Sequence, residues 1–229
     1  MRIFERVGLG AETFKTFASG GVFSKYSHEY QTLLPVGEDT IYFNEDKSVV
    51  LNKEVLEEEV LKDLGVRREE LKEAQGAEVG NIFTLKYKYS EPLGLKFQTK
   101  EGEQKTVFMG CYGIGVSRVF GVIVEKFADE KGLVFPEEVA PYKYYIVANG
   151  EKGLKKAEEI YEQFREKDLM ILDDRDVRFG EKMKDAELMG IPTRVVISDR
   201  GLETNEVEVT NRKTGETKKV SLGEFLTNI

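Results

Sequence analysis

The chain has 229 residues, of which 40% are hydrophobic, and a formal net charge of −8. This length supports buried cores and favours two modest domains. One cysteine excludes a disulfide framework, and one cysteine with one histidine is too few for a structural zinc site. The acidic balance excludes a bulk polycation, so we expect no DNA partner, and any RNA contact must use a local cluster of Lys and Arg.

The charged N-terminus lacks the apolar run of a signal peptide, and no segment has the pattern of a spanning helix. We therefore expect a cytoplasmic protein with no membrane partner.

Hydrophobic periodicity and glycine positions predict the following elements in the first part of the chain. They are a helix over 2–9, a loop over 16–27, strands over 28–35 and 40–44, a solvated helical connector over 47–75, strands over 78–90 and 104–112 with a hairpin at 100–104, and a helix from 116 to about 132. The connector assignment depends on its dense charge and its narrow apolar stripe.

Two of the five prolines lie in 132–143, which makes that segment the predicted domain boundary. Beyond it, strands and helices alternate: strands at 143–148, 169–174 and 193–198, helices at 151–167 and 181–190, and a terminal pair around 213–219. This alternation predicts an α/β domain with a largely parallel sheet.

The segment MGCYGIGVSR, Met109–Arg118, joins a predicted strand to a predicted helix. Gly113 and Gly115 permit a sharp turn, and the first helical amides attract anions. The guanidinium of Arg118 can fork onto phosphate and stack on a base. A dinucleotide-binding turn is disfavoured because the third glycine of that motif is absent. A tight turn with Arg118 in a surface ion pair remains an alternative.

Cys111 and His28 are the residues that a cysteine hydrolase would use. A cysteine hydrolase is disfavoured because no partner residue stands beside the cysteine in the sequence. A lone cysteine on a strand is more often a small buried hydrophobe, so we expect Cys111 to be buried, and an exposed thiol is the alternative.

Two acids, Glu29 and Glu78, stand in apolar strands where an unpaired carboxylate would be costly. Strand alternation places Ser27 and Glu29 on one face and His28 on the other. Each acid therefore needs a cation, either in an internal ion pair or from a ligand amine or Mg²⁺ bridging phosphates.

Four blocks, in order, resemble the bacterial-type prolyl-tRNA synthetases, a family of class II aminoacyl-tRNA synthetases. MGCYGIGVSR followed by VFGVIVE resembles motif 3 of that family. GGVFSKYSHEYQTLLPVGEDTIYF resembles its proline-binding loop and the following strand, and AEVGNIFTLKYKYSEPLG resembles the next active-site strand. VAPYKYYIVA and LDDRDVRFGEKMKDAELMGIPTRVVIS resemble its anticodon-binding domain.

The resemblance implies a role for each matching residue. Arg118 corresponds to the arginine that packs on adenine and reaches the ATP phosphates, and Glu78 to the position facing the ATP ribose and Mg²⁺. Gly113 and Gly115 correspond to the glycines that admit substrate. The implied proline pocket comprises Ser27, His28, Glu29, Asn81, Phe83 and Cys111, closed by a mobile loop that contains Gly20 and Gly21.

The family pattern and this chain differ in two places. The segment at about 44–77 is too short for the family's editing domain, and no segment resembles motifs 1 and 2, which build the dimer interface and part of the ATP site. The resemblance thus implies the C-terminal portion of a proline–tRNA ligase that uses ATP and Mg²⁺. Its partners would be proline, tRNA, and either a second copy in the complete enzyme or a separate N-terminal half.

The implied fold is α+β: a partial class II catalytic core, an antiparallel sheet with helices, over residues 1–136, followed by an α/β anticodon-binding domain over 137–229. A non-catalytic, synthetase-like protein that binds tRNA or another protein is the alternative. Candidate tRNA contacts are Arg175, Arg178, Lys182 and Lys184. A solvated helix end balanced by neighbouring acids is an equal reading of that cluster.

Overall fold

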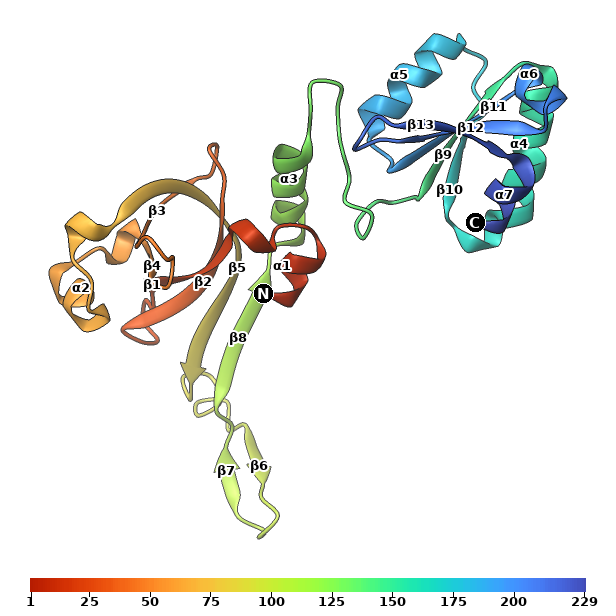
Figure 1. Cartoon of the computed structure of the whole chain (residues 1–229). Coiled ribbons are helices and arrows are strands. Elements are labelled where there is room, and N and C mark those ends of the chain that lie inside the picture. The colour runs from red at the N-terminus through yellow and green to blue at the C-terminus, as the bar shows by residue number, and fades with distance from the viewer. The chain divides into compact units, whose positions relative to one another are not determined.

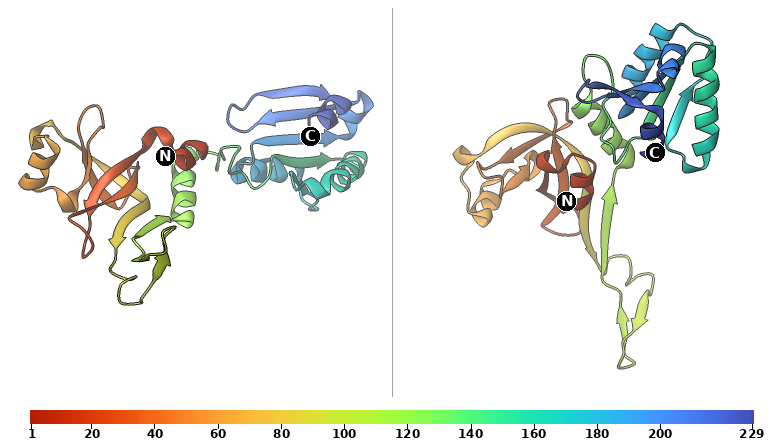
Figure 2. Two further views of the ribbon diagram at one scale, coloured as in Figure 1. Left: turned by 90° about the horizontal axis from the view of Figure 1, so that it is seen from below. Right: turned by 45° about the vertical axis from the view of Figure 1, so that its right-hand side comes forward.

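The computed structural model describes residues 1–229, and the chain divides into two compact units, Met1–Ile123 and Val124–Ile229. Figures 1 and 2 show the ribbon from three directions. None of its helices is both long and apolar enough to cross a membrane.

The first unit is built on one twisted sheet of six strands. These are β1 (Thr13–Ser19), β2 (Tyr26–Leu33), β3 (Asp39–Phe43), β4 (Val50–Asn52), β5 (Lys72–Lys86) and β8 (Met109–Ile114). Their order is β2-β1-β4-β3-β5-β8, and a further pairing of β2 with β5 closes the first five into a ring. All pairs are antiparallel except β1 with β4.

The longest strand, β5, holds this sheet together. Its first part pairs with β3, its middle with β2 and its end with β8. The register shifts at Tyr30/Gln31 against β2 and at Thr84/Lys86 against β8. Such bulges bend a strand and re-aim its side chains, and both lie next to candidate site residues.

The predicted helical connector over 47–75 is wrong for most of its length. The structure has β4, an α-helix only at α2 (Glu58–Leu64), two single-turn 3-10 helices at Lys53–Val55 and Arg68–Glu70, and the start of β5. Gly65, with φ +69°, ends α2 in the left-handed conformation that glycine favours. The apolar stripe forms a core instead of facing solvent: Leu51, Val55, Val60 and Leu61 pack together with Phe17 and Tyr26.

This unit also contains α1 (Arg2–Arg6), most of α3 (Val116–Phe127) and a two-stranded hairpin of β6 (Lys96–Gln98) and β7 (Gln104–Thr106). The loop predicted over 16–27 begins only after Ser19, because Thr13–Ser19 pairs with β2. The helix predicted to end near Gly132 ends at Phe127, and residues 129–132 form a turn.

The second unit contains a five-stranded sheet in the order β10-β9-β11-β12-β13. The strands are β9 (Tyr144–Asn149), β10 (Met170–Asp173), β11 (Thr193–Ser198), β12 (Glu206–Asn211) and β13 (Thr217–Ser221), and the helices are α4 (Glu151–Phe164), α5 (Phe179–Met189), α6 (Asp199–Glu203) and α7 (Leu222–Thr227). Only β10, β9 and β11 run parallel, so the sheet is mixed and not largely parallel.

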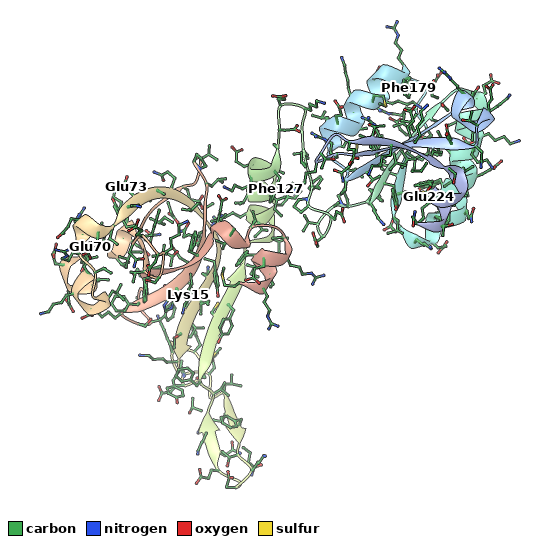
Figure 3. The ribbon with its side chains drawn as sticks, viewed as in Figure 1. Lys15, Glu70, Glu73, Phe127, Phe179 and Glu224 are labelled. Carbon is green, nitrogen blue, oxygen red and sulfur yellow. The ribbon has the colours of Figure 1, made fainter.

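Alternation along β9 creates the two cores of this unit. Tyr144, Ile146 and Ala148 pack with α4 and α7 on one face, and Tyr145 and Val147 pack with α5 on the other. Phe179, labelled in Figure 3, is the first residue of α5 and is partly exposed. The predicted strands and helices of this unit are confirmed.

The core beneath α2 generates a prediction about stability. Leu61 is buried and Lys62 beside it is exposed. We expect Leu61→Ala to cost about 2–5 kcal/mol in local unfolding free energy, because it leaves a cavity, and Lys62→Ala to change it by less than about 0.5 kcal/mol. Native-state hydrogen exchange of the β4 amides measures both. Equal effects of the two substitutions would mean that α2 is a solvated connector after all.

Candidate active site

One face of the sheet carries most of the candidate residues of the first unit. Across β2, β5 and β8, Glu29 pairs with Asn81 and Asn81 pairs with Gly113. Phe83 lies opposite Cys111 on the next rung of the same face. Three strands that are distant in sequence thus bring a carboxylate, an amide and a glycine into one row.

The bulge between β2 and β5 brings Glu78 onto this face. Glu78 and Asn81 are three residues apart, so a regular strand would direct them to opposite faces. The register shift gives Val79 the extra position, and Asn81 Nδ2 donates to Glu78 Oε1 at 3.1 Å. Val79 itself is fully buried.

Arg118 lies in the first turn of α3 and reaches back over the middle of β5. Its Nη1 donates to the backbone oxygen of Glu78 at 2.8 Å and lies 3.3 Å from Glu78 Oε2 and 3.5 Å from Glu38 Oε1. The predicted ion pair of Glu78 is therefore present. Because Arg118 is 49% exposed, its guanidinium also remains accessible from solvent.

Gly113 and Gly115 provide room for close approach. Neither has a positive φ, so the turn from β8 into α3 does not require glycine for its backbone angles. A Cβ at residue 113 would lie 3.0 Å from Asn81 Oδ1, and one at residue 115 would lie 3.3 Å from Arg118 Cβ. Glycine thus keeps the space between the strand end and the arginine open.

Glu29 is 8% exposed and its hydrogen-bond partners within the chain are amides, so the internal ion pair, one of the two predicted sources of a cation, is not formed. Its Oε1 accepts hydrogen bonds from Gln31 Nε2 at 2.9 Å and Asn52 Nδ2 at 2.8 Å. Burial raises the pKa of Glu29, the two amide hydrogen bonds oppose this, and the nearby carboxylates Glu78 and Asp39 raise it further.

Sequence reasoning missed three of the groups around Glu29. Gln31 also donates to Asp39, and its Oε1 is buried without a partner. Alternation along β2 was a sufficient signal to find Gln31, two residues after Glu29. Asn52 and Asp39 had no such signal, because Asn52 lies in the predicted helical connector and Asp39 lies between two predicted strands.

The loop after β1 is positioned by aromatic and ionic contacts. A Cβ at Gly20 would overlap the backbone of Ser24, and Gly21 has φ +53°, so this turn requires both glycines. The ring of Phe23 lies 6.2 Å from that of Phe83. At the end of the loop, Lys25 Nζ binds Glu59 and Asp63 of α2 at 2.7 and 2.8 Å.

His28 and Cys111 do not meet. His28 pairs with Ile82 and packs on Phe17, whereas Cys111 pairs with Phe83 on the opposite face. Burial and the nearby Lys15 lower the pKa of His28. Cys111 is exposed, contrary to the expectation that it is buried. The geometry therefore disfavours a cysteine hydrolase, whose base must reach the thiol.

In the second unit, the four candidate RNA-binding cations differ in availability. Lys182 is buried and donates to the backbone oxygen of Asp173 at 2.8 Å, and Arg175 binds Asp173 and Asp185, both at 2.7 Å. The guanidinium of Arg175 lowers the pKa of Asp173 to about 2. Arg178 and Lys184 are exposed.

The comparisons with known proteins agree with this arrangement. Residues 2–127 match the model of the tRNA synthetase class II core domain (G, H, P, S and T), and residues 143–229 match that of the anticodon binding domain. The first match covers more than half of the chain. The chain therefore belongs to the class II aminoacyl-tRNA synthetases, and the predicted fold, an α+β core followed by an anticodon-binding domain, is confirmed.

Its relatives are more specific. The chain is 33% identical to the proline–tRNA ligase of Wolbachia pipientis wMel over 99% of its own length and 56% of that protein. It is 33% identical to the proline–tRNA ligase of Ehrlichia chaffeensis over 100% of this chain and 57% of that protein. It is 45% identical to the proline–tRNA ligase of Persephonella marina over 70% of this chain and 29% of that protein. The chain thus spans about half the length, or less, of the curated relatives it matches.

Glu29 generates a pH-dependent prediction. Because its pKa in the folded chain lies above the ordinary 4.5, the folded state binds its proton more tightly than the unfolded state. The contribution of Glu29 to stability therefore falls as pH rises above 4.5. We expect Glu29→Gln, which does not titrate, to gain stability relative to the unsubstituted chain over this range. Urea unfolding of both chains between about pH 4 and 7 measures the difference. A difference that does not vary with pH would contradict the prediction.

Proposed function

We propose that this chain is the C-terminal portion of a proline–tRNA ligase, which activates proline with ATP and transfers it to tRNA in the cytoplasm. The observation that carries the proposal is the Arg118–Glu78 pair beside Gly113 and Gly115, at the point where β8 meets α3. A permanent cation, a carboxylate and an open strand end meet there, inside the segment that matches the class II core model.

The residues present fit ATP with Mg²⁺. Mg²⁺ keeps several waters and takes one or two protein carboxylates together with substrate phosphates, so the single partly exposed carboxylate of Glu78 suits it. Arg118 would hold phosphate and stack on the base, and Mg²⁺ would neutralise developing phosphate charge. Catalysis then needs no side-chain nucleophile, only positioning and electrostatic stabilisation.

The proline pocket in this proposal lies on the face shared by β2, β5 and β8. It comprises Ser27, Glu29, Asn81, Phe83 and Cys111, with the loop at Gly20 and Gly21 above it. His28 lies on the other face of β2, so its part in this pocket is to hold the strand against Phe17. The exposure of Cys111 favours contact with a small substrate.

The free edge of β8 supports the proposal that motifs 1 and 2 act from outside these 229 residues. β8 pairs only with β5, and its Tyr112 is 78% exposed. An unpaired edge with apolar side chains is a surface that another strand or chain covers. We assign this role to the remainder of the catalytic core, whether it is supplied by a second copy or by a separate N-terminal half.

Two further parts of the proposal concern the segment at 44–77 and the anticodon. That segment packs its apolar residues against the strands of the first unit, which leaves no separate core for a hydrolytic domain. The anticodon-binding domain, which we place at 137–229 after a catalytic part at 1–136, would contact tRNA chiefly through Arg178 and Lys184. Arg175 and Lys182 would shape that surface through Asp173.

The test of the proposal is proline-dependent exchange of pyrophosphate into ATP, run on this chain alone and with a polypeptide that supplies motifs 1 and 2. We expect exchange in the mixture, because the two halves together complete the ATP site. No exchange in a mixture shown to be folded and associated would favour the alternative, a non-catalytic relative that binds tRNA or another protein.

Substitution of Arg118 gives a second prediction. We expect Arg118→Ala to lower the exchange rate in the mixture by about 100- to 1000-fold, the usual cost of removing a preorganised donor to developing charge. Arg118→Lys keeps the charge without the planar fork and should recover only part of the rate. Arg67→Ala, an exposed arginine paired with Glu70, is the matched control. Equal rates for the Arg118 and Arg67 variants would remove Arg118 from the ATP site.

A further inference from the structure

Residues 86–108, from the last residue of β5 to the residue before β8, form an arm with no partner in the chain beyond its own base. Its strands β6 and β7 pair only with each other, as a separate two-stranded sheet. Figures 1 and 2 show the arm extending past the ends of β5 and β8. An isolated hairpin is marginally stable in water, so a ligand that covers the arm would stabilise it.

One side of the arm presents aromatic rings and a lysine around an open cavity. Phe97 and Lys105 are cross-strand partners and share a face. With Tyr87, Phe108, Glu91 and Thr106 they line a cavity of about 470 Å³. Tyr87 and Phe108 meet edge to face at 5.4 Å, and all three rings are exposed. Exposed rings around a cavity offer stacking surfaces for planar groups.

The arm is also positively charged in an acidic protein. It contains five lysines and three glutamates, a net charge of +2, whereas the whole chain carries −8. Lys105 pairs with Glu103 at 3.1 Å, but both side chains are more than half exposed. Aromatic rings interleaved with lysines are the combination that binds single-stranded nucleic acid, the rings stacking on bases and the lysines contacting phosphates.

The base of the arm adjoins the candidate proline pocket. The strands that lead into it carry Phe83 and Cys111. The ring centroid of Tyr89 lies 6.1 Å from that of Phe23, which is in the loop after β1 that contains Gly20 and Gly21. Lys88 Nζ lies 4.4 Å from the Phe23 ring centroid. A polymer bound along the arm would therefore end at the pocket.

We propose that the arm binds the unpaired 3′ end of tRNA and directs its terminal nucleotide to the proline pocket. Bases stack on Tyr87, Phe97 and Phe108, and phosphates bind the lysines, including Lys105. The inference rests on the proposed function, because it takes tRNA as the substrate. It assigns to the first unit an RNA contact separate from the cations of the second.

The test uses the full chain and a short, fluorescently labelled RNA ending in CCA, with affinity measured over a range of salt concentrations. The chain carries Arg178→Ala and Lys184→Ala throughout, so that binding by the second unit is reduced. We expect Phe97→Ala to weaken binding about tenfold. Lys105→Ala should reduce the slope of log K against log salt by about 0.7, and Lys62→Ala on α2 is the matched charge control.

Three outcomes would overturn the inference. One is equal binding by the arm variants and Lys62→Ala, and another is a fully paired RNA that competes as well as the single strand. The third is a dimer by sedimentation that Phe97→Ala converts to monomer, because a second copy would then cover the arm. The assay contains neither proline nor ATP, so its failure would leave the pyrophosphate-exchange result standing.

Discussion

The candidate site depends on one strand that serves three neighbours. The 15 residues of β5 pair in turn with β3, β2 and β8, so any shift in its register would move every side chain on the shared face. The bulge at Val79 is the critical point of this strand, because it turns Glu78 to the side of Asn81. The same strand continues into the arm, which links the pocket to the exposed aromatic surface beyond it.

On the face shared by β2, β5 and β8, the two carboxylates Glu29 and Glu78 have different partners. Glu29 is satisfied by amides and has a raised pKa, whereas Glu78 at the open end pairs with Arg118. The buried end of the face is thus acidic with neutral hydrogen-bond donors, and the open end carries the permanent cation.

The second unit uses part of its positive charge for its own structure. Arg175 binds both Asp173 and Asp185, and the buried Lys182 donates to the backbone oxygen of Asp173. These two cations therefore join the end of β10 to α5. The sequence shows four basic residues close together but not which of them are already neutralised. Only the positions of Asp173 and Asp185 separate the structural pair from the two exposed residues, Arg178 and Lys184.

The sequence by itself determined the order of the elements that have regular periodicity: most of β2, β5 and α3, and the alternating strands and helices of the second unit. The motif MGCYGIGVSR was sufficient to identify Arg118 as a candidate, and an acid in an apolar strand was sufficient to identify Glu78. The tertiary structure decided what depends on distant partners. It made β1 and β4 strands, shortened the charged helix to α2, exposed Cys111, and supplied Asn52 to Glu29. The physical reason is that a local sequence pattern reflects only the backbone conformation that its residues favour and the side of the element that is buried. Register, bulges and the partners of buried polar groups are set only when strands far apart in sequence meet.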